Sequence, residues 1–366
     1  MKKNLLIFHP IIPPYRINFF NALSERFCTT ICLFWRNLKD QIFDYPKLQA
    51  QFHFQEQYLI REEIGLFNWI KGIWKMINAS KPTTVISTEF GIPTVAIIAH
   101  RLLTFSKYKI VVMNDDSYDM TIKSDNFTYR HMIAKIILLP FIDDLIVVDS
   151  RVAKYYQRKY KKGIWFPIIY DDNYLRKKYH SLLPQSNKHI IKYGLKGKKI
   201  LLFVGRLVAI KNVVLALKCF LKLNYPDSVF VIIGDGPEKP HLEQISHDSS
   251  NVIFTGRLEG DALYLWYNIA HLFILPSLIE PFGAVVSEAL IAGCKVIVSQ
   301  RAGSSCLIFD EENGEIFDPE NEDELQSIMK ENLQKISVIE HPLSGIRTSC
   351  LREDFVTSIA RLHTHL

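Results

Sequence analysis

The sequence has 366 residues, 48% of them hydrophobic, and this length and composition predict two globular domains of ordinary size. Its six cysteines lack the C-x-x-C spacing of zinc and redox sites, so we expect reduced, mostly buried thiols. An uncharged apolar stretch of ~18 residues is absent from the sequence, which excludes an integral membrane protein. We therefore expect a cytoplasmic protein or a peripheral one on the inner face of the plasma membrane.

The net charge of +6 is unevenly distributed along the chain. Residues 1–200 carry +15 and residues 201–366 carry −9 when Lys and Arg are counted against Asp and Glu. A basic first half predicts an anionic partner there, either phospholipid headgroups or a pyrophosphate-linked acceptor. Nucleic acid is a weaker alternative, because the sequence has no recognition motif for it.

Residues 1–170 predict an N-terminal α/β domain. The basic and then apolar start mimics a signal peptide, but His9-Pro10 and Pro13-Pro14 interrupt it, so we expect a first strand instead. Short apolar runs then alternate with helical patterns, which is typical of a parallel sheet with helices on both faces. The expected strands are Asn4–Phe8, Thr30–Trp35, Thr84–Ser87, Lys109–Met113 and Asp144–Val148.

The alternation stops after Pro167, and residues 171–198 are predicted to be a linker. A second domain, expected over residues 199–345, repeats the alternation and is followed by a helical segment over residues 346–366. The predicted fold class is therefore α/β, with two facing doubly wound, Rossmann-like domains and a cleft between them. Its expected strands are Lys199–Val204, Ser228–Ile233, Asn251–Phe254, His271–Leu275 and Lys295–Val298, and its expected helices include Val213–Leu223, Val285–Ala292 and Arg352–Leu362.

Ligands of doubly wound sheets bind beyond the carboxyl ends of the strands, and unusual residues stand at those ends in the second domain. Gly205 permits a close turn, and Arg206 and Lys211 place two cations beside a helix start, which suits a diphosphate. A plain surface loop is the alternative. Gly234 and Gly236 follow the next strand, either because a base or ribose approaches the main chain or because a tight turn needs a positive φ.

The segment from Glu280 to Glu288 is the strongest indication of a ligand site in the sequence. A strand ends near Leu275 and a helix starts near Gly283, so the backbone N–H groups of Gly283 and Ala284 would point at a negative ligand. Glu288 lies in an otherwise apolar helix, where a carboxylate needs a partner or a ligand. Such a carboxylate can accept hydrogen bonds from vicinal hydroxyls, as on a ribose; a glutamate at the solvent edge is the alternative.

With these motifs in this order, the chain resembles the retaining glycosyltransferases of GT-B fold, and in particular glycosyltransferase family 4, which builds bacterial capsule, exopolysaccharide and lipopolysaccharide. The resemblance covers residues 198–330 and includes two further motifs, Gly256-Arg257-Leu258 and Asn313-Gly314. It implies that Arg206 and Lys211 bind the diphosphate and that Glu280 binds the sugar hydroxyls. The backbone of Phe282, Gly283 and Ala284 would hold the sugar or phosphate. Glu288 would bind the ribose, and the nucleotide site would be lined by Gly205, Gly234 and Leu258.

The resemblance also implies retention of anomeric configuration. Fixed cations and helix-end amides stabilise a departing diphosphate directly, so we expect a metal-independent reaction with no cofactor. The absence of an Asp-x-Asp motif from the sequence agrees with this. The chain departs from the family pattern at one loop. Many relatives carry Gly-Gly-x-x-Glu after the strand that corresponds to Lys295–Val298, whereas this chain has Arg301-Ala302-Gly303-Ser304-Ser305-Cys306.

The resemblance implies that the N-terminal domain, residues 1–170, binds the acceptor, but this domain has fewer recognisable motifs. Asp115 and Asp116 follow a strand, and we expect one of them to position the acceptor hydroxyl; helix capping by Asp116 or Ser117 is the alternative. Glu89 is a weaker candidate for the same reason. Arg16, at a helix start, binds a phosphate or lies on the surface.

Two stretches mix aromatic and basic residues, Phe67–Lys75 and Lys154–Lys162. On helices such faces suit a membrane surface that carries a lipid-linked acceptor. The alternatives are that Trp69 and Trp74 belong to the core and that the second stretch is a solvated face.

The function that we predict is transfer of a hexose or deoxyhexose from a UDP- or GDP-sugar donor to a saccharide or lipid-linked oligosaccharide acceptor, in bacterial surface polysaccharide synthesis. The alternatives are a nucleotide-sugar epimerase of the same fold and a non-catalytic scaffold derived from a transferase.

Overall fold

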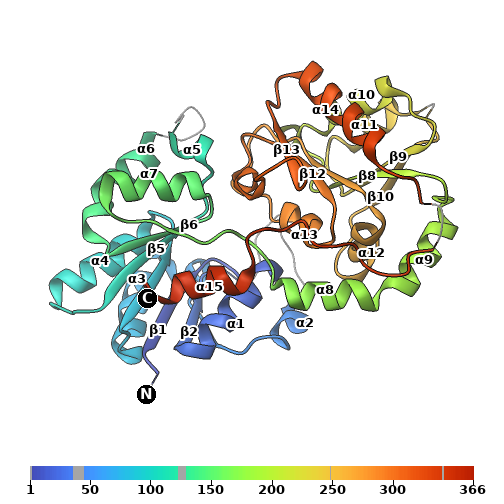
Figure 1. Ribbon diagram of the computed structural model, residues 1–366. Helices are drawn as coiled ribbons and strands as arrows, with labels where there is room; N and C mark the ends of the chain where they lie inside the picture. Colours follow the sequence, from blue (N-terminus) through green and yellow to red (C-terminus); the bar gives the residue numbers. More distant parts are fainter. Residues whose placement is uncertain (1, 36–44, 123–128, 248, 340–341) are drawn as a thin grey trace. The chain divides into compact units, whose positions relative to one another are not determined.

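The computed structural model describes residues 2–35, 45–122, 129–247, 249–339 and 342–366 (Figure 1). The chain forms two compact units, each built on its own sheet of parallel strands. Unit 1 comprises Met1–Asp116, Met120–Ile168 and Val356–Leu366, and unit 2 comprises Ser117–Asp119 and Ile169–Phe355. Two Rossmann-like halves were expected from the sequence, and this part of the prediction is confirmed.

The sheet of unit 1 has the strand order β3-β2-β1-β4-β5-β6-β7. Its central strands are apolar runs that are buried on both faces, as parallel sheets require. The strand β3 is polar and alternately exposed because it lies at the edge, and it was not predicted. The strands are β1 (Asn4–His9), β2 (Cys28–Leu33), β3 (Gln55–Tyr58), β4 (Thr84–Thr88), β5 (Lys109–Asn114), β6 (Asp144–Val147) and β7 (Ile164–Trp165).

Helices connect the strands of unit 1 and bury one apolar face each. Trp69, Ile73 and Ile77 project from one face of α3 into a core shared with β1, β4 and β5. The side chain of Asp149 caps α7 by accepting a hydrogen bond from the backbone N–H of Arg151 at 2.8 Å. The helices are α1 (Ile17–Arg26), α2 (Tyr45–Gln49), α3 (Arg61–Ser80), α4 (Ile92–Leu103), α5 (Tyr118–Ile122, shared with unit 2), α6 (Tyr129–Leu138) and α7 (Ser150–Tyr160), with the short 3-10 helices η1 (Pro14–Arg16) and η2 (Leu139–Phe141).

The sheet of unit 2 has the order β10-β9-β8-β11-β12-β13. Every residue of β9 is buried, which follows from its uninterrupted apolar sequence. The strands are β8 (Lys199–Val204), β9 (Ser228–Ile233), β10 (Val252–Gly256), β11 (Leu272–Leu275), β12 (Lys295–Ser299) and β13 (Gly314–Phe317). The helices are α8 (Asp172–Ser181), α9 (Leu183–Lys192), η3 (Ala209–Lys211), α10 (Val213–Leu223), α11 (Lys239–Ile245), α12 (Asp261–Ile269), α13 (Val285–Ile291), η4 (Gly303–Leu307) and α14 (Glu322–Lys335).

The segment predicted to be a linker, residues 171–198, is largely helical instead. It contains α8 and α9, and Asp171 caps α8 by accepting from the backbone N–H of Tyr174 at 3.0 Å. The fully buried Tyr179 anchors α8, and its hydroxyl donates to the backbone carbonyl of Glu288 at 3.0 Å. These helices are rich in lysine and poor in apolar residues, so their helical periodicity is weak in the sequence.

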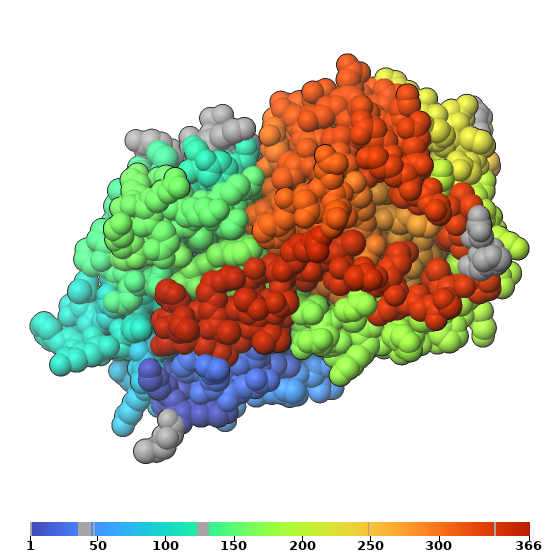
Figure 2. All heavy atoms as spheres, in the orientation of Figure 1, coloured from blue at the N-terminus to red at the C-terminus, as the bar shows by residue number. Residues whose placement is uncertain are grey.

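The chain returns to unit 1 at its C-terminal end. In the segment predicted to be helical, residues 346–366, the helix itself is α15 (Phe355–His363). The ring of His363 lies 6.0 Å from that of Phe27, and the carbonyl of Leu366 accepts a hydrogen bond from Thr84 at 3.3 Å. Figure 2 shows this red segment against the blue N-terminal part of unit 1.

Candidate functional site

The predicted donor residues of unit 2 gather at one edge of its sheet. They follow β8, β9, β10 and β11, which are neighbours in the strand order, and parallel strands end at the same edge. Hydrogen bonds connect the loops: the N–H of Gly205 donates to Ile233 at 3.0 Å, and that of Gly234 donates to Gly256 at 3.0 Å. The N–H of Leu278, after β11, donates to the carbonyl of Ile210 at 2.8 Å.

The glycines of this edge are required by packing between the loops. A Cβ on Gly234, whose φ is +150°, would lie 1.8 Å from the carbonyl oxygen of Gly205. A Cβ on Gly236 would lie 2.4 Å from the carbonyl oxygen of Leu207. Both glycines have a positive φ, +150° and +154°, which agrees with the turn explanation that the sequence left open. The contacts add a reason that the sequence did not suggest, because the main chain of each glycine lies against another loop.

Lys211 and Glu280 form an ion pair between η3 and the loop after β11. Their side chains are only 16% and 10% exposed, and the hydroxyl of Ser277 donates to the same carboxylate at 3.4 Å. Asn212, which follows Lys211 in the left-handed conformation, ties this loop to the carbonyl of Pro319 at 3.0 Å. A desolvated cation and a desolvated carboxylate are thus fixed side by side at the sheet edge.

The loop before α13 presents its backbone at the same place. The described residues offer no hydrogen-bond acceptor to the N–H groups of Gly283 and Ala284. Phe282 is buried and anchors the loop, while its carbonyl accepts from the N–H of Ser304 at 2.8 Å. These two peptide donors follow Glu280, the partner of Lys211, on the same loop, and together with this cation they can bind an anion.

The loop that departs from the family pattern packs directly on this site. The N–H of Gly303 donates to the carbonyl of Glu280 at 3.2 Å. The hydroxyl of Ser304 is fully buried and has no hydrogen-bond partner in the described part of the chain. It lies 3.1 Å from the position that a Cβ on Gly283 would take. Sequence reasoning missed Ser304; the only signal was the retained Gly303 beside it.

Glu288 is buried, so the alternative of a solvent-edge position is wrong. The hydroxyl of Tyr267 donates to its carboxylate at 2.8 Å, and Tyr170 also bonds to it. Burial raises the pKa of Glu288 to about 7, while the bonds from the two tyrosines act in the opposite direction. The two tyrosines were not predicted, because their positions in the sequence give no hint that they meet on one carboxylate.

The remaining predicted donor residues lie on the neighbouring loops. Arg206 is exposed at the end of β8, and Leu258 is half-buried after β10. Arg257, beside Leu258, pairs with Glu259, with its Nε at 3.0 Å from the carboxylate. The structure therefore joins Lys211 and Glu280 by an ion pair and places Gly283 against the Glu280 side chain, since an added Cβ would lie 3.3 Å from Cγ of Glu280. Arg206 and Leu258 follow strands that end at the same edge.

In unit 1 the predicted acceptor residues are held in ion pairs. Asp115 accepts from Arg16 at 2.7 Å, and Asp116 pairs with Lys135 in buried surroundings. Arg16 is 1% exposed, so the prediction that it could lie on the surface is wrong. Glu89 stands at the end of β4, the neighbour of β5 in the sheet.

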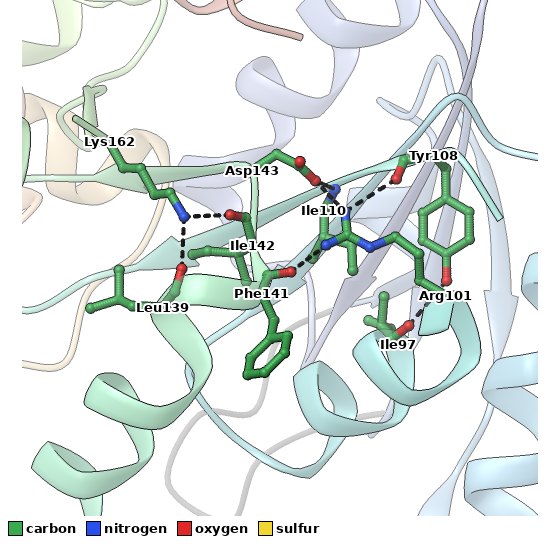
Figure 3. A network of polar contacts seen from close by, with 9 residues as sticks. All are labelled: Ile97, Arg101, Tyr108, Ile110, Leu139, Phe141, Ile142, Asp143 and Lys162. Carbon is green, nitrogen blue, oxygen red and sulfur yellow. Dashed lines mark hydrogen bonds and ion pairs between the residues drawn. The ribbon is translucent and has the colours of Figure 1, made fainter. Parts of the chain in front are cut away.

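The two aromatic and basic stretches are only partly available for a membrane. Trp69 is 2% exposed, and the indole N–H of Trp74 donates to the carbonyl of Ala96 at 2.9 Å, which confirms their place in the core. Lys162 is also engaged, because its ammonium donates to the carbonyls of Leu139 at 2.7 Å and Ile142 at 2.5 Å (Figure 3). Phe67 is 69% exposed, with the ammonium of Lys71 4.3 Å from its ring.

Apolar side chains are exposed elsewhere on unit 1, at the end of α4 and along α6 and η2. The guanidinium of Arg101, on α4, bonds to Asp143 and to the carbonyl of Phe141 at 2.5 Å, and so holds the two segments together (Figure 3). Residues 92–110 and 129–141 contain no Asp or Glu. We call this surface the apolar face; it consists of Leu102, Leu103, Phe105, Met132, Ile133, Ile136, Ile137 and Phe141, which are 38–89% exposed.

The fold is that of the GT-B glycosyltransferases. The protein is similar over nearly its whole length to Alr3699/HepE of Anabaena, whose structure was solved in complex with UDP. The TM-score is 0.77 at 16% sequence identity, and the match covers 99% of this chain and 98% of that one. At this identity the likeness shows the architecture of two Rossmann-like halves.

The family evidence lies in unit 2, where residues 185–335 match the family model described as Glycosyl transferases group 1. The uncharacterized glycosyltransferase MJ1607 of Methanocaldococcus jannaschii is 35% identical over 132 residues, which are 35% of this chain and 34% of that protein. The GDP-mannose-dependent alpha-mannosyltransferase of Corynebacterium glutamicum is 37% identical over 123 residues, which are 33% of this chain and 28% of that protein. The chain thus matches about a third of the length of these curated relatives. Among the described residues, no helix has the length and apolar character needed to cross a bilayer.

Proposed function

We propose that the protein is a glycosyltransferase that uses a nucleotide-diphosphate sugar as its donor. The observation that carries this proposal is the group formed by Lys211, Glu280 and the N–H groups of Gly283 and Ala284. It combines a cation and peptide donors, which suit a diphosphate, with a carboxylate that suits sugar hydroxyls. The group lies within the segment that matches the glycosyltransferase family model.

The donor residues take the following roles in this proposal. Arg206 and Lys211 hold the diphosphate, and the backbone of Phe282–Ala284 holds the sugar or phosphate. The ribose and the base are bound on neighbouring loops, by Glu288 and by the main chain at Leu258. Alr3699/HepE was solved with UDP and with UDP-glucose, and one relative is GDP-mannose-dependent, so the nucleotide is UDP or GDP.

The chemistry needs stabilisation of the leaving group more than a strong base. The bond from the anomeric carbon to the diphosphate oxygen breaks, and its electron pair leaves with the diphosphate. The acceptor oxygen bonds to the same carbon, and its proton passes to the leaving phosphate on the same face, which retains the configuration. Arg206, Lys211 and the loop N–H groups neutralise the developing negative charge, so we propose a metal-independent transfer with no cofactor.

For the acceptor we propose unit 1, at the edge that carries Asp115 and Asp116. A saccharide or lipid-linked oligosaccharide of bacterial surface polysaccharide synthesis is the acceptor class. The apolar face supports the lipid-linked form, because exposed apolar side chains on segments that contain basic residues, with the nearby Asp143 paired to Arg101, suit an anionic membrane surface. We therefore propose a cytoplasmic enzyme that binds the inner face of the plasma membrane.

A thermal-shift comparison of UDP, GDP, ADP and CMP tests the proposal. A nucleotide present at 100 times its dissociation constant stabilises the native protein by about 2.7 kcal/mol, which raises the melting temperature by several degrees. We expect UDP or GDP to do so and CMP not to. Failure of all four to stabilise the protein, together with no release of UDP or GDP from UDP-glucose or GDP-mannose, would overturn the proposal.

A further inference from the structure

Glu89 has an unusual backbone conformation at the carboxyl end of β4. Its φ is +60°, in the left-handed region that non-glycine residues rarely adopt because it is strained for them. Two hydrogen bonds hold it there: its N–H donates to the carbonyl of Met113 at 2.9 Å, and its carbonyl accepts from the hydroxyl of Thr94 at 2.6 Å. The surrounding structure thus fixes the Glu89 backbone at both ends.

The side chain of Glu89 is directed toward the end of β5 and meets only neutral donors there. Asn114 donates its amide N–H to Oε2 at 2.7 Å, and the backbone N–H of Asp115 donates to Oε1 at 3.4 Å. Asp115 and Asp116 have cationic partners in Arg16 and Lys135. Among the described residues, no Lys or Arg forms an ion pair with Glu89.

Two buried polar atoms have unused hydrogen-bonding capacity, one on Asn114, which bonds to Glu89, and one on Arg16, which pairs with Asp115. The side chains of Arg16 and Asn114 are at most 1% exposed. In the described part of the chain, neither Nη1 of Arg16 nor Oδ1 of Asn114 has a hydrogen-bond partner. A buried polar group without a partner is destabilising, so a ligand that supplied both partners would be favoured at this position. A hydroxyl group can both donate and accept, and a sugar carries several.

We propose that Arg16, Glu89 and Asn114 form a hydroxyl-binding site for the acceptor on unit 1, in which the ionised Glu89 accepts a hydrogen bond from an acceptor hydroxyl. This inference rests on the proposed transferase function. It assigns the direct contact to Glu89 and leaves Asp115 and Asp116 to hold the cations around the site. Glu89 binds and positions the hydroxyl, and no proton is transferred to it in this scheme.

The charged and titratable groups around Glu89 determine when it ionises. Burial, followed by the negative charges of Asp116 and Asp115, raises the pKa of Glu89 to about 7, against the bonds from Asn114 and from the backbone N–H of Asp115. Tyr156 of α7 also faces the carboxylates, and burial holds its pKa above the ordinary value, so it stays neutral. His9 is neutral as well, because burial and Arg16 lower its pKa to about 4. Acceptor binding should therefore strengthen as the pH rises through about 7.

The test uses the full chain with UDP-glucose or GDP-mannose as donor and octyl glucoside, octyl galactoside and octyl mannoside as acceptors. The variant Glu89→Gln keeps the shape of the side chain but cannot ionise. We expect it to raise the acceptor KM at least tenfold at pH 8 and to abolish the rise of kcat/KM between pH 6 and 8. The donor KM and donor hydrolysis without acceptor should stay within twofold. Glu25→Gln, on the exposed part of α1, is the matched control.

A second variant and a binding measurement make each outcome decisive. Glu89→Asp keeps an ionisable carboxylate and should retain the pH dependence, which a merely structural effect on the loop would not restore. Saturation-transfer NMR with the same octyl glycosides should show contact in the native protein and a weaker signal in Glu89→Gln. An unchanged acceptor KM and pH profile in Glu89→Gln overturns the inference while the transferase function stands, and so does the absence of glycoside contact in a protein that binds UDP or GDP. Absence of both nucleotide binding and donor turnover overturns the proposed function itself, and the inference with it.

Discussion

The hydroxyl of Tyr267 donates a hydrogen bond to the carboxylate of Glu288 at 2.8 Å, and both side chains are buried. Tyr170 bonds to the same carboxylate. An acidic side chain in a mostly apolar helix is therefore provided with neutral donors rather than with a cation. This arrangement leaves the charge of Glu288 sensitive to pH in the neutral range, and the first prediction follows from that.

The Glu288→Gln variant should lose a pH dependence of stability. The pKa of Glu288 in the folded protein is about 7, above its ordinary value of 4.5, so the folded protein holds this proton more tightly than the unfolded chain does. The contribution of this proton to the free energy of unfolding is fully present below pH 4.5 and is lost as the pH rises through 7. The loss is on the order of 3 kcal/mol. Urea unfolding at pH 5 and pH 8 should show a smaller decrease in the variant than in the native protein. Equal decreases would contradict the assignment.

Removal of one partner of the Lys211–Glu280 pair should reduce both stability and activity. Lys211→Met leaves Glu280 largely desolvated without its cation, which costs about 3–5 kcal/mol for a buried pair. If Lys211 holds the diphosphate, kcat should also fall by roughly 10²-fold or more. Stability is measured by urea unfolding, and kcat with UDP-glucose or GDP-mannose.

Two comparisons separate these effects. The double variant Lys211→Met/Glu280→Gln should recover much of the stability but none of the activity, since no uncompensated charge remains. Arg206→Ala should lower kcat on a similar scale with a change in stability below about 0.5 kcal/mol, because Arg206 is exposed. Full activity in Lys211→Met would mean that this cation does not stabilise the leaving group.

The variant Gly234→Ala should disrupt the edge of the unit 2 sheet where the loops after β8 and β9 meet. Its Cβ would lie 1.8 Å from the carbonyl oxygen of Gly205, so the two loops must move apart, at a cost of about 3 kcal/mol or more. Gly256→Ala is the control, because its φ is +72° but no atom lies within 4 Å of the added Cβ, and about 1 kcal/mol is expected. Denaturant unfolding and nucleotide titration should separate the two variants; equal effects would exclude loop contact as the reason for glycine.

Metal removal should leave the reaction intact. The proposed mechanism neutralises the diphosphate with Arg206, Lys211 and backbone N–H groups, so no divalent ion is needed for leaving-group departure. The initial rate in excess EDTA should stay within about twofold of the rate without chelator. An absolute requirement for Mg²⁺ or Mn²⁺, shown by recovery on adding either ion, would refute the mechanism.

The apolar face should bind anionic lipid. Leu103 and Phe105 are 68% and 89% exposed, and their replacement by serine in one double variant removes apolar contact without touching the core. Flotation with vesicles of phosphatidylglycerol and phosphatidylcholine should recover the native protein and markedly less of this variant. The matched control is Phe309→Ser, at a position that is 56% exposed on unit 2. Equal flotation of all three proteins would place membrane contact elsewhere or exclude it.

The sequence predicted the fold well because both sheets are built from apolar, β-branched strands with clear ends. The grouping of Lys211 with Glu280 at one edge also followed, since strand ends meet in a parallel sheet. The helices α8 and α9 were missed because their polar, lysine-rich sequences resemble a linker. The partners of Glu288 and the fixed conformation of Glu89 were beyond prediction, because they depend on contacts between residues far apart in the chain.

Unit 1 is not continuous in the chain, since α15 joins it after the whole of unit 2. During synthesis, unit 2 can therefore complete its fold while unit 1 still lacks a helix. A fragment containing only residues 1–168 would expose the surface that α15 covers and should aggregate more readily than the full chain. Expression of unit 1 alone would need this distant helix to be supplied, either by fusion through a short connector or as a separate peptide.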